Sequence, residues 1–432
     1  MLSRMSLMLV LLSSALPARA ELLTLPEAER RALASDATRG ATAKIAQVDA
    51  ELDAVRSDRH PIVNFNTEAS AAPGGRLVEM EAVDGQRFLV PGSRRLGDSG
   101  AFTTVPRFGG LVSMQANLFD FGRSSSRIRA AEHRARSTRT EEQASRADLV
   151  RAVREAYLTW TVAHARVSLA ERHLEQGRAR FEMIKSWIAE GTRPTADLNV
   201  AQQDEISLEL ELADTRGLLD RARLGIEQLA GGSWPKSAVP DLGLLDMAAG
   251  DVPADTAAPL GSAALEEAAD AATAQADSVS HDHAPVISTS AEVGVRGQST
   301  VVFPAYRVGV MVTVPLWDGG IGAARARAAR AQSDALRAEA AAARKGREDE
   351  RQLARIDLER SREKLRLVEQ LRLLAQQNLD QAGEWYRLGA VDLWVVVDAR
   401  ERLSRAEARE LTAKADRTGA WLRAGYSVRP SE

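Results

Sequence analysis

The sequence repeats itself at a spacing of 198 residues, and this internal duplication constrains the fold more than any other feature of the 432-residue chain. Residues 118–122 read Leu-Phe-Asp-Phe-Gly, and residues 316–320 read Leu-Trp-Asp-Gly-Gly. The same spacing relates Gly191 to Gly389. Because an insertion between these landmarks would change the spacing, the two units should contain helices of equal length.

Each unit is predicted to contain an opening helix, two strands, a very long helix, a tight turn and a returning helix. In the first unit, 21–230, we predict an opening helix at 22–59, strands at about 61–70 and 108–120, a long helix at 124–188, a tip at 191–198 and a return helix at 198–230. In the second unit, 261–427, we predict a helical run at 265–276, strands at about 285–297 and 304–317, a long helix at 321–388, a tip at 389–392 and a return helix at 393–425. Thr24 and Glu27 form a capping-box pattern at the first opening helix.

Two segments break the symmetry between the units. Pro61 corresponds to Pro285 at the larger spacing of 224 residues, so the first unit should carry a longer loop at about 72–107. Between the units, residues 231–260 are rich in Gly, Pro, Ala and Asp, which is typical of a surface linker.

Side chains at 306–316 alternate between apolar and other types, which is the two-residue period of a strand with one apolar face. The apolar set is Tyr306, Val308, Val310, Val312, Val314 and Leu316. Two interpretations fit. Strands of about 9 to 11 residues can cross a bilayer with such a face toward lipid, and a small soluble sheet shows the same alternation. Because four strands cannot close a membrane pore, the first interpretation requires several chains.

Apolar residues, many of them alanine, recur every three or four positions along the long helices. In the first long helix they are Val153, Ala156, Trp160, Ala163, Val167, Ala170 and Leu174. This 3.5-residue repeat predicts helices that supercoil around their neighbours. The helix predicted at 124–188 would be about 100 Å long at 1.5 Å per residue, which exceeds a compact domain.

The first twenty residues predict export. They contain Arg4, an apolar run at 5–16 and a small-residue end, which is typical of a signal peptide cleaved before Glu21. The apolar run is shorter than the roughly 20 residues of a membrane anchor, and no later segment predicts a transmembrane helix. The absence of cysteine excludes disulfides, thiolate chemistry and lipid attachment to cysteine. With 57 Lys and Arg against 60 Asp and Glu, charge gives no reason to expect nucleic acid.

Together these features resemble the outer-membrane efflux protein family typified by TolC. The resemblance covers about residues 22–427 and rests on the duplicated strand-to-helix motif, the Ala156-Tyr157 pair and the two tips that begin at Gly191 and Gly389. It implies a mainly α fold with a small β part. Four strands from each chain would contribute to a trimeric, twelve-stranded outer-membrane β-barrel, continued by a periplasmic tube of coiled-coil α-helices.

The resemblance also implies a function and a set of partners. The chain would be a passive outer-membrane exit duct that extends into the periplasm and serves a tripartite efflux pump or a type I secretion system. Its partners would be two further copies of itself, a periplasmic adaptor (membrane fusion) protein, an inner-membrane transporter and outer-membrane lipid. An alternative is a periplasmic coiled-coil structural protein that never forms a pore. No catalytic, cofactor-binding or phosphate-binding motif stands out, so we predict neither an enzyme nor a cofactor.

Candidate site residues cluster at the tips. The resemblance implies adaptor docking through Gly191, Arg193, Asp197, Gly389, Asp392 and Trp394. Asp392 and Asp398 are candidates for acidic rings that constrict the pore, although Asp392 fits a helix N-cap equally well. Arg193 would either hold the tip closed or be solvated. The two glycines fit turn positions that other residues avoid.

A second group of candidates marks the junctions between strands and long helices. These residues are Asp120, Gly122, Asp318 and Gly320. Elsewhere, His281, Asp282 and His283 are the one cluster with metal-ligand chemistry. Because no third ligand follows nearby in the sequence, we do not predict a metal site.

Overall fold

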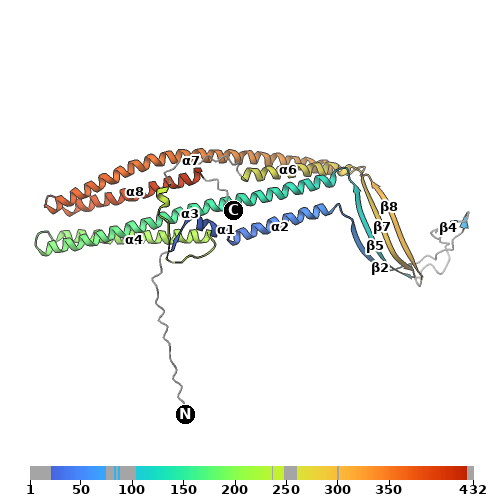
Figure 1. The fold of residues 1–432 in the computed structure, drawn as a ribbon, viewed down its shortest axis with the longest axis horizontal. Helices are drawn as coiled ribbons and strands as arrows, with labels where there is room; N and C mark the ends of the chain where they lie inside the picture. Colours follow the sequence, from blue (N-terminus) through green and yellow to red (C-terminus); the bar gives the residue numbers. More distant parts are fainter. Residues whose placement is uncertain are drawn as a thin grey trace, which may run out of the picture. The chain divides into compact units, whose positions relative to one another are not determined.

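The computed structural model describes residues 21–73, 82–83, 86–87, 104–235, 237–247, 260–298 and 301–425. The predicted signal peptide lies outside the described residues, as do parts of the predicted loop 72–107 and of the linker 231–260. The chain divides into two compact units, and each unit takes segments from both repeats (Figure 1). The sheet unit contains residues 45–138 and 264–339, and the helical unit contains the rest.

The sheet unit is built around four antiparallel strands. They are β2 (Ile62–Pro73), β5 (Thr104–Phe119), β7 (Val286–Gln298) and β8 (Val301–Thr313), in the order β2-β5-β7-β8. Strand β8 ends earlier than the predicted 304–317. Pro315, which has no N–H to donate to a ladder, lies just beyond its end. Two further short strands, β3 (Ala82–Val83) and β4 (Gln86–Arg87), pair with each other within the predicted first loop.

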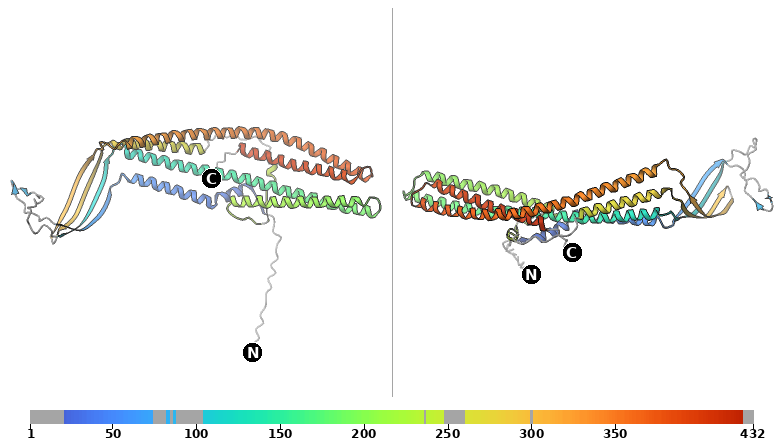
Figure 2. Two further views of the ribbon diagram at one scale, coloured as in Figure 1. Left: turned by 180° about the vertical axis from the view of Figure 1, so that it is seen from behind. Right: turned by 90° about the horizontal axis from the view of Figure 1, so that it is seen from above.

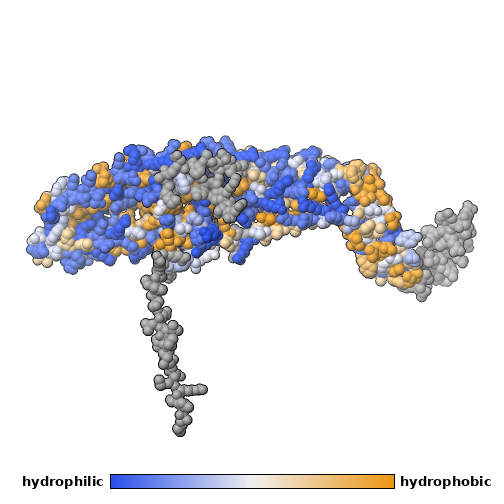
Figure 3. Space-filling model, viewed as in Figure 1, coloured by the Kyte–Doolittle hydropathy of each residue, from blue (hydrophilic) through white to orange (hydrophobic). Residues whose placement is uncertain are grey.

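The register of the sheet gathers apolar side chains on one face. Directly paired residues share a face, so Phe65 lies beside Val112, Val112 beside Val293 and Val293 beside Tyr306. The exposed apolar residues of this face are Val63, Phe65, Phe108, Val112, Met114, Val293, Val295, Val302, Tyr306, Val308, Val310 and Val312. Figure 3 shows hydrophobic residues gathered over the strands, whereas hydrophilic residues predominate over the helices.

The opposite face of the sheet is mostly polar. Its polar residues are Asn64, Asn66, Glu68, Arg107, Ser113, Gln115, Ser290, Glu292, Arg296 and Arg307, and it also exposes the apolar residues Ile62, Phe303 and Met311. Across two neighbouring strands, the Asn66 side chain donates a hydrogen bond to Ser113 Oγ at 3.0 Å. The predicted alternation along residues 306–312 is therefore a real difference between the two faces.

Four helices adjoin the strands in the sheet unit. They are α2 (Asp36–Ser57), the first part of α3 (Arg123–Ala189), α6 (Leu260–Ser280) and the first part of α7 (Ile321–Arg387). Helix α6 is alanine-rich and presents buried Ala269, Ala272 and Ala276 to its neighbours. Polar contacts also join α6 to its neighbours. For example, Ser137 Oγ on α3 donates a hydrogen bond to the Ala264 carbonyl on α6 at 2.9 Å. None of the described helices carries an apolar stretch long enough to cross a lipid bilayer.

The helical unit pairs α3 with α4 (Ala196–Leu229) and α7 with α8 (Leu393–Gly425), as the views in Figure 2 show. The predicted heptad positions Val153, Trp160, Ala163, Val167, Ala170 and Leu174 are buried. At the tip end, Ile184 and Ala201 share one core with Ala382 and Ala399, which lie 198 residues later. Residues at corresponding positions of the two repeats are therefore packed in the same core.

Small elements complete the helical unit near Tyr157. Strand β1 (Glu21–Leu23) pairs in parallel with β6 (Ala238–Pro240), and α5 (Leu244–Met247) follows. The Tyr157 hydroxyl donates to the Leu23 carbonyl at 2.6 Å and accepts from the Asp241 amide at 2.8 Å. Burial raises the pKa of Tyr157 to about 12. The buried Tyr157 hydroxyl thus joins strand β1 to the segment that follows β6.

The predicted opening helix 22–59 is wrong in two respects. The segment forms α1 (Leu25–Leu33) and α2, separated by a break at Ala34 and Ser35. Thr24 occupies the N-cap of α1, but its side chain makes no capping hydrogen bond. The predicted capping box fails because Glu27 pairs forward with Arg31 at 2.9 Å instead of reaching back.

Candidate functional site: the helix tips and the strand-to-helix junctions

The two hairpin tips end their long helices with the same backbone motif. Gly191 and Gly389 have φ angles of 74° and 75°, in the left-handed region that favours glycine. The Gly191 amide donates to the Ile188 carbonyl, and the next amide reaches back to Trp187, both at 3.0 Å. Corresponding bonds of 2.9 Å form at Gly389. These are Schellman caps, and they confirm the predicted turn role of both glycines.

Arg193, Asp197 and Tyr386 join the two tips. The Tyr386 hydroxyl donates a 2.6 Å hydrogen bond to Asp197 Oδ2, and both side chains are buried. The Arg193 guanidinium lies 4.1 Å from the centre of the Tyr386 ring and also donates to the Tyr386 backbone carbonyl. Burial, followed by the hydrogen bond to Asp197, raises the pKa of Tyr386. Arg193 is therefore engaged in a contact between the repeats, and Tyr386 is its partner.

A buried ion-pair cluster lies on α4 beyond the tip contact. Asp204 accepts from Arg400 Nη2 at 2.6 Å and from Arg180 Nη1 at 3.2 Å. Its side chain is 4% exposed, against 10% for Arg400 and 17% for Arg180. The cluster connects α3, α4 and α8. Sequence reasoning missed it because its members are separated by 24 and 196 residues.

The acidic candidates at the second tip have different surroundings. Asp392 precedes α8, is exposed, and accepts the Val395 amide at 3.1 Å through its backbone carbonyl. Asp398 forms an ion pair with Arg402 one turn later, at 2.7 Å. Between them, Trp394 points to solvent with 64% of its surface exposed.

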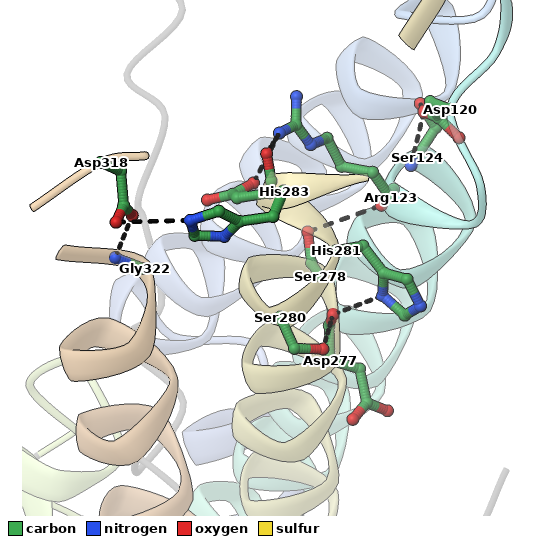
Figure 4. Close-up of polar contacts among 11 residues, drawn as sticks. Asp120, Arg123, Ser124, Asp277, Ser278, Ser280, His281, His283, Asp318 and Gly322 are labelled. Carbon is green, nitrogen blue, oxygen red and sulfur yellow. Dashed lines mark hydrogen bonds and ion pairs between the residues drawn. The ribbon is translucent and has the colours of Figure 1, made fainter. Parts of the chain in front are cut away.

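The strand-to-helix junctions are built alike in both repeats (Figure 4). Asp120 accepts the Gly122 amide at 3.3 Å and the Ser124 amide at 2.8 Å. At the corresponding place, Asp318 accepts the Gly320 amide at 2.8 Å and the Gly322 amide at 2.6 Å. Each carboxylate therefore satisfies free amides at the start of a 67-residue helix.

The same hydrogen bonds perturb both carboxyl groups. Backbone donation from Gly322 and Gly320 lowers the pKa of Asp318. Partial burial opposes ionisation of Asp120, but hydrogen bonds from Ser124 and Gly122 outweigh it and lower its pKa as well. Both groups are thus held in the charged form that caps the helices.

These shifts predict a loss of stability in acid. Groups whose pKa is depressed in the folded state stabilise it above their unfolded pKa of about 3.9, and this stabilisation disappears as the pH falls through the folded value. The melting temperature should therefore fall between about pH 5 and pH 3. Asp120→Asn/Asp318→Asn should melt lower at neutral pH and show a smaller acid-induced fall. Asp334→Asn, an exposed change on α7, should melt as the wild type does at each pH.

The histidine cluster does not converge on a common point. His281 Nδ1 lies 2.6 Å from the Asp277 carbonyl, whereas His283 Nε2 lies 3.3 Å from Asp318 Oδ1 (Figure 4). Asp282 pairs with Arg123 at 3.0 Å. Among the described residues, no group of three or more His, Cys, Asp or Glu side chains is arranged to hold a metal ion.

Comparison with known proteins decides the family. The sequence pattern described as outer membrane efflux protein matches residues 30–232 and 261–423, which together form most of the chain. The chain belongs to the outer membrane efflux protein family. This membership confirms the resemblance inferred from the duplicated motifs and the outer-membrane location that it implied. A search of curated proteins found no significant match.

Solved structures share the fold of this outer membrane efflux protein. A structure of CusC has a TM-score of 0.78 at 18% identity and covers 93% of this chain and 90% of its own. The open-state channel MtrE of Neisseria gonorrhoeae has a TM-score of 0.77 at 17% identity, and the match covers 95% of this chain and 92% of MtrE. The CmeC channel of Campylobacter jejuni has a TM-score of 0.78 at 14% identity, and the match covers 93% of this chain and 85% of CmeC. These likenesses confirm the mainly α fold with four principal strands per chain.

Proposed function

We propose that three copies of this chain form a passive exit duct in the outer membrane. The observation that carries the proposal is the four-stranded sheet, whose exposed apolar face lies opposite a polar face. Strands β2 and β8 are its edges and pair on one side only within the described residues. Free edges in a membrane leave backbone groups without hydrogen bonds, so each β8 should pair with the β2 of a neighbouring copy.

Closure of such a sheet explains both faces. Three copies would supply twelve strands, with the apolar set toward lipid and residues such as Glu292 and Arg307 toward a water-filled lumen. The structurally similar MtrE and CmeC are described as outer-membrane channels. This chain's own β residues therefore have the distribution that a channel requires.

The tips are the proposed docking surface for a periplasmic adaptor tied to an inner-membrane transporter. Gly191 and Gly389 fix the two turns, while Asp392 and Trp394 extend into solvent beside them. Other apolar side chains are exposed nearby, including Leu388 at 74% and Trp385 at 51%. Exposed apolar groups with a polar rim are typical of protein contact sites. Energy and cargo selection would come from the transporter.

The tip contacts are also the proposed closure of the duct. Arg193 and Asp197 from the first repeat hold Tyr386 from the second, so opening the entrance requires these bonds to break. Threefold symmetry would repeat Asp392 around the pore. Asp398 is already paired with Arg402, which makes Asp392 the stronger candidate for an acidic ring.

This closure predicts a conductance change. Tyr386→Phe removes the hydroxyl that bonds to Asp197 but keeps the ring under Arg193. A hydrogen bond to a charged group contributes about 1.5–3 kcal/mol, so the open fraction should rise about tenfold or more in planar bilayers. As a control, Trp385→Phe changes the adjacent exposed residue, and this variant should conduct as the wild type does. Unchanged conductance in Tyr386→Phe would remove this contact from the gate.

The cellular location of the protein and the mass of the extracted assembly test the proposed duct. Detergent-dependent extraction of a trimer from outer membranes, followed by conductance in planar bilayers, is the expected result. A monomer in the soluble periplasmic fraction would overturn the duct and support the alternative of a periplasmic coiled-coil protein without a pore.

A further inference from the structure

A pocket of about 440 Å³ lies at the strand-to-helix junctions of the sheet unit. Its wall combines the first turns of α3 and α7 with the short helix η1 (His281–His283). Arg127 and Arg325, which line it from opposite helices, stand 198 residues apart and thus occupy the same position in the two repeats. The duplication has placed two guanidinium groups around one cavity.

Some charged side chains of this pocket have hydrogen-bond or ion-pair partners, and others have none among the described residues. Arg123 donates to the Asp282 backbone carbonyl at 2.8 Å and pairs with its carboxylate at 3.0 Å. Asp318 is engaged by helix amides and by His283. By contrast, Arg127 and Arg325 are exposed and form no hydrogen bond or ion pair with any described residue. The acidic side chains of the wall are therefore occupied, and two cations remain available for an anion.

The position of the pocket relative to the proposed membrane indicates which anion it binds. Phe119, at the end of β5, and its counterpart Trp317, in the connection from β8 to α7, are 54% and 85% exposed. Exposed aromatic residues at strand ends mark the boundary between hydrocarbon and headgroups. Arg127 and Arg325 lie four residues into α3 and α7, about 6 Å along each helix. The headgroup region is about 5–8 Å thick on each side of the hydrocarbon, so these side chains reach phosphate level.

We propose that this pocket binds the phosphate of a glycerophospholipid in the periplasm-facing leaflet, with Arg127 and Arg325 as its ligands. Guanidinium groups donate paired hydrogen bonds that match phosphate oxygens. The proposal rests on the proposed function, because it requires the sheet to lie in the membrane. Bound lipid would fix the depth of each junction and brace α3 against α7 where the strands end.

Lipid retention tests the site. The full-length trimer, extracted from outer membranes, is loaded with phosphatidylglycerol, washed in detergent and weighed by native mass spectrometry. Arg127→Gln/Arg325→Gln should retain at least about tenfold less lipid than the wild type, since two charge-assisted contacts are lost. Arg327→Gln/Arg330→Gln removes the same charge from α7 outside the pocket and should retain lipid as the wild type does. Equal retention in the first variant would overturn the proposal.

Two further measurements separate the remaining outcomes. Inorganic phosphate is titrated onto the delipidated trimer, and saturation that phosphatidylglycerol cannot compete with would identify a soluble phosphate and overturn the lipid assignment. Melting temperature and trimer mass report whether the double variant folds. A trimeric, membrane-inserted wild type that retains no lipid would overturn only this inference, whereas a chain absent from the membrane would overturn the proposed function.

Discussion

Replacing Asp204 with alanine should lower the free energy of unfolding by about 3–5 kcal/mol, because two largely buried guanidinium groups lose their shared counter-charge. Asp204 is 4% exposed and is bonded to Arg180 and Arg400 from two other helices. The change would appear as a lower melting temperature by far-ultraviolet circular dichroism. Asp220→Ala, an exposed substitution on the same helix, should stay within about 0.5 kcal/mol of the wild type.

A companion variant separates charge from packing. Buried ion clusters can often be replaced by apolar side chains of similar volume without loss of stability. Arg180→Met/Asp204→Leu/Arg400→Met should therefore recover most of the stability that Asp204→Ala loses. If Asp204→Ala melted as the wild type does, the two arginines would not depend on this carboxylate, and the assignment of the cluster as a helix-to-helix tie would be wrong.

Val308→Arg should abolish stable insertion into the outer membrane. Val308 lies near the middle of β8, is 80% exposed and belongs to the apolar face. An arginine facing lipid at the bilayer midplane costs about 2–4 kcal/mol, and a trimer would incur this cost three times. The expected result is loss of the trimer from the outer-membrane fraction.

The adjacent residue provides the matched control. Gly309 faces the other side of the sheet, and a side chain there would meet no atom within 4 Å of its first carbon. Gly309→Arg should therefore insert normally and alter conductance instead. If both variants inserted equally well, the apolar face would not contact lipid, and the sheet would be soluble.

Features with a short sequence period could be predicted, whereas long-range pairings could not. The two-residue alternation around Val310 located the apolar face, and the recurring Gly191 and Gly389 located both turns. The capping prediction at Thr24 failed because Glu27 had a nearby arginine as a competing partner. A sequence pattern lists possible hydrogen bonds, and the local competition between charges decides which of them form.

The features that the sequence did not reveal, in the site and in the fold, share a cause. Tyr386 and Asp197 are 189 residues apart, and their contact depends on how two hairpins meet. Strands β1 and β6 contain three residues each, which is too short to show a period. In both cases the information lies in the tertiary packing. The equal spacing of the repeats predicted only that the two units contain helices of equal length.

Each compact unit takes segments from both repeats, and this has a consequence for how the protein is made. A fragment ending in the linker would lack half of the strands, half of the helix pairs and Tyr386, the partner of Asp197 and Arg193. Such a fragment would leave apolar surface uncovered in both units. Completion of the sheet and of the tip must therefore wait for synthesis and export of the second repeat, and a truncated chain should be degraded instead of accumulating as a half-sized duct.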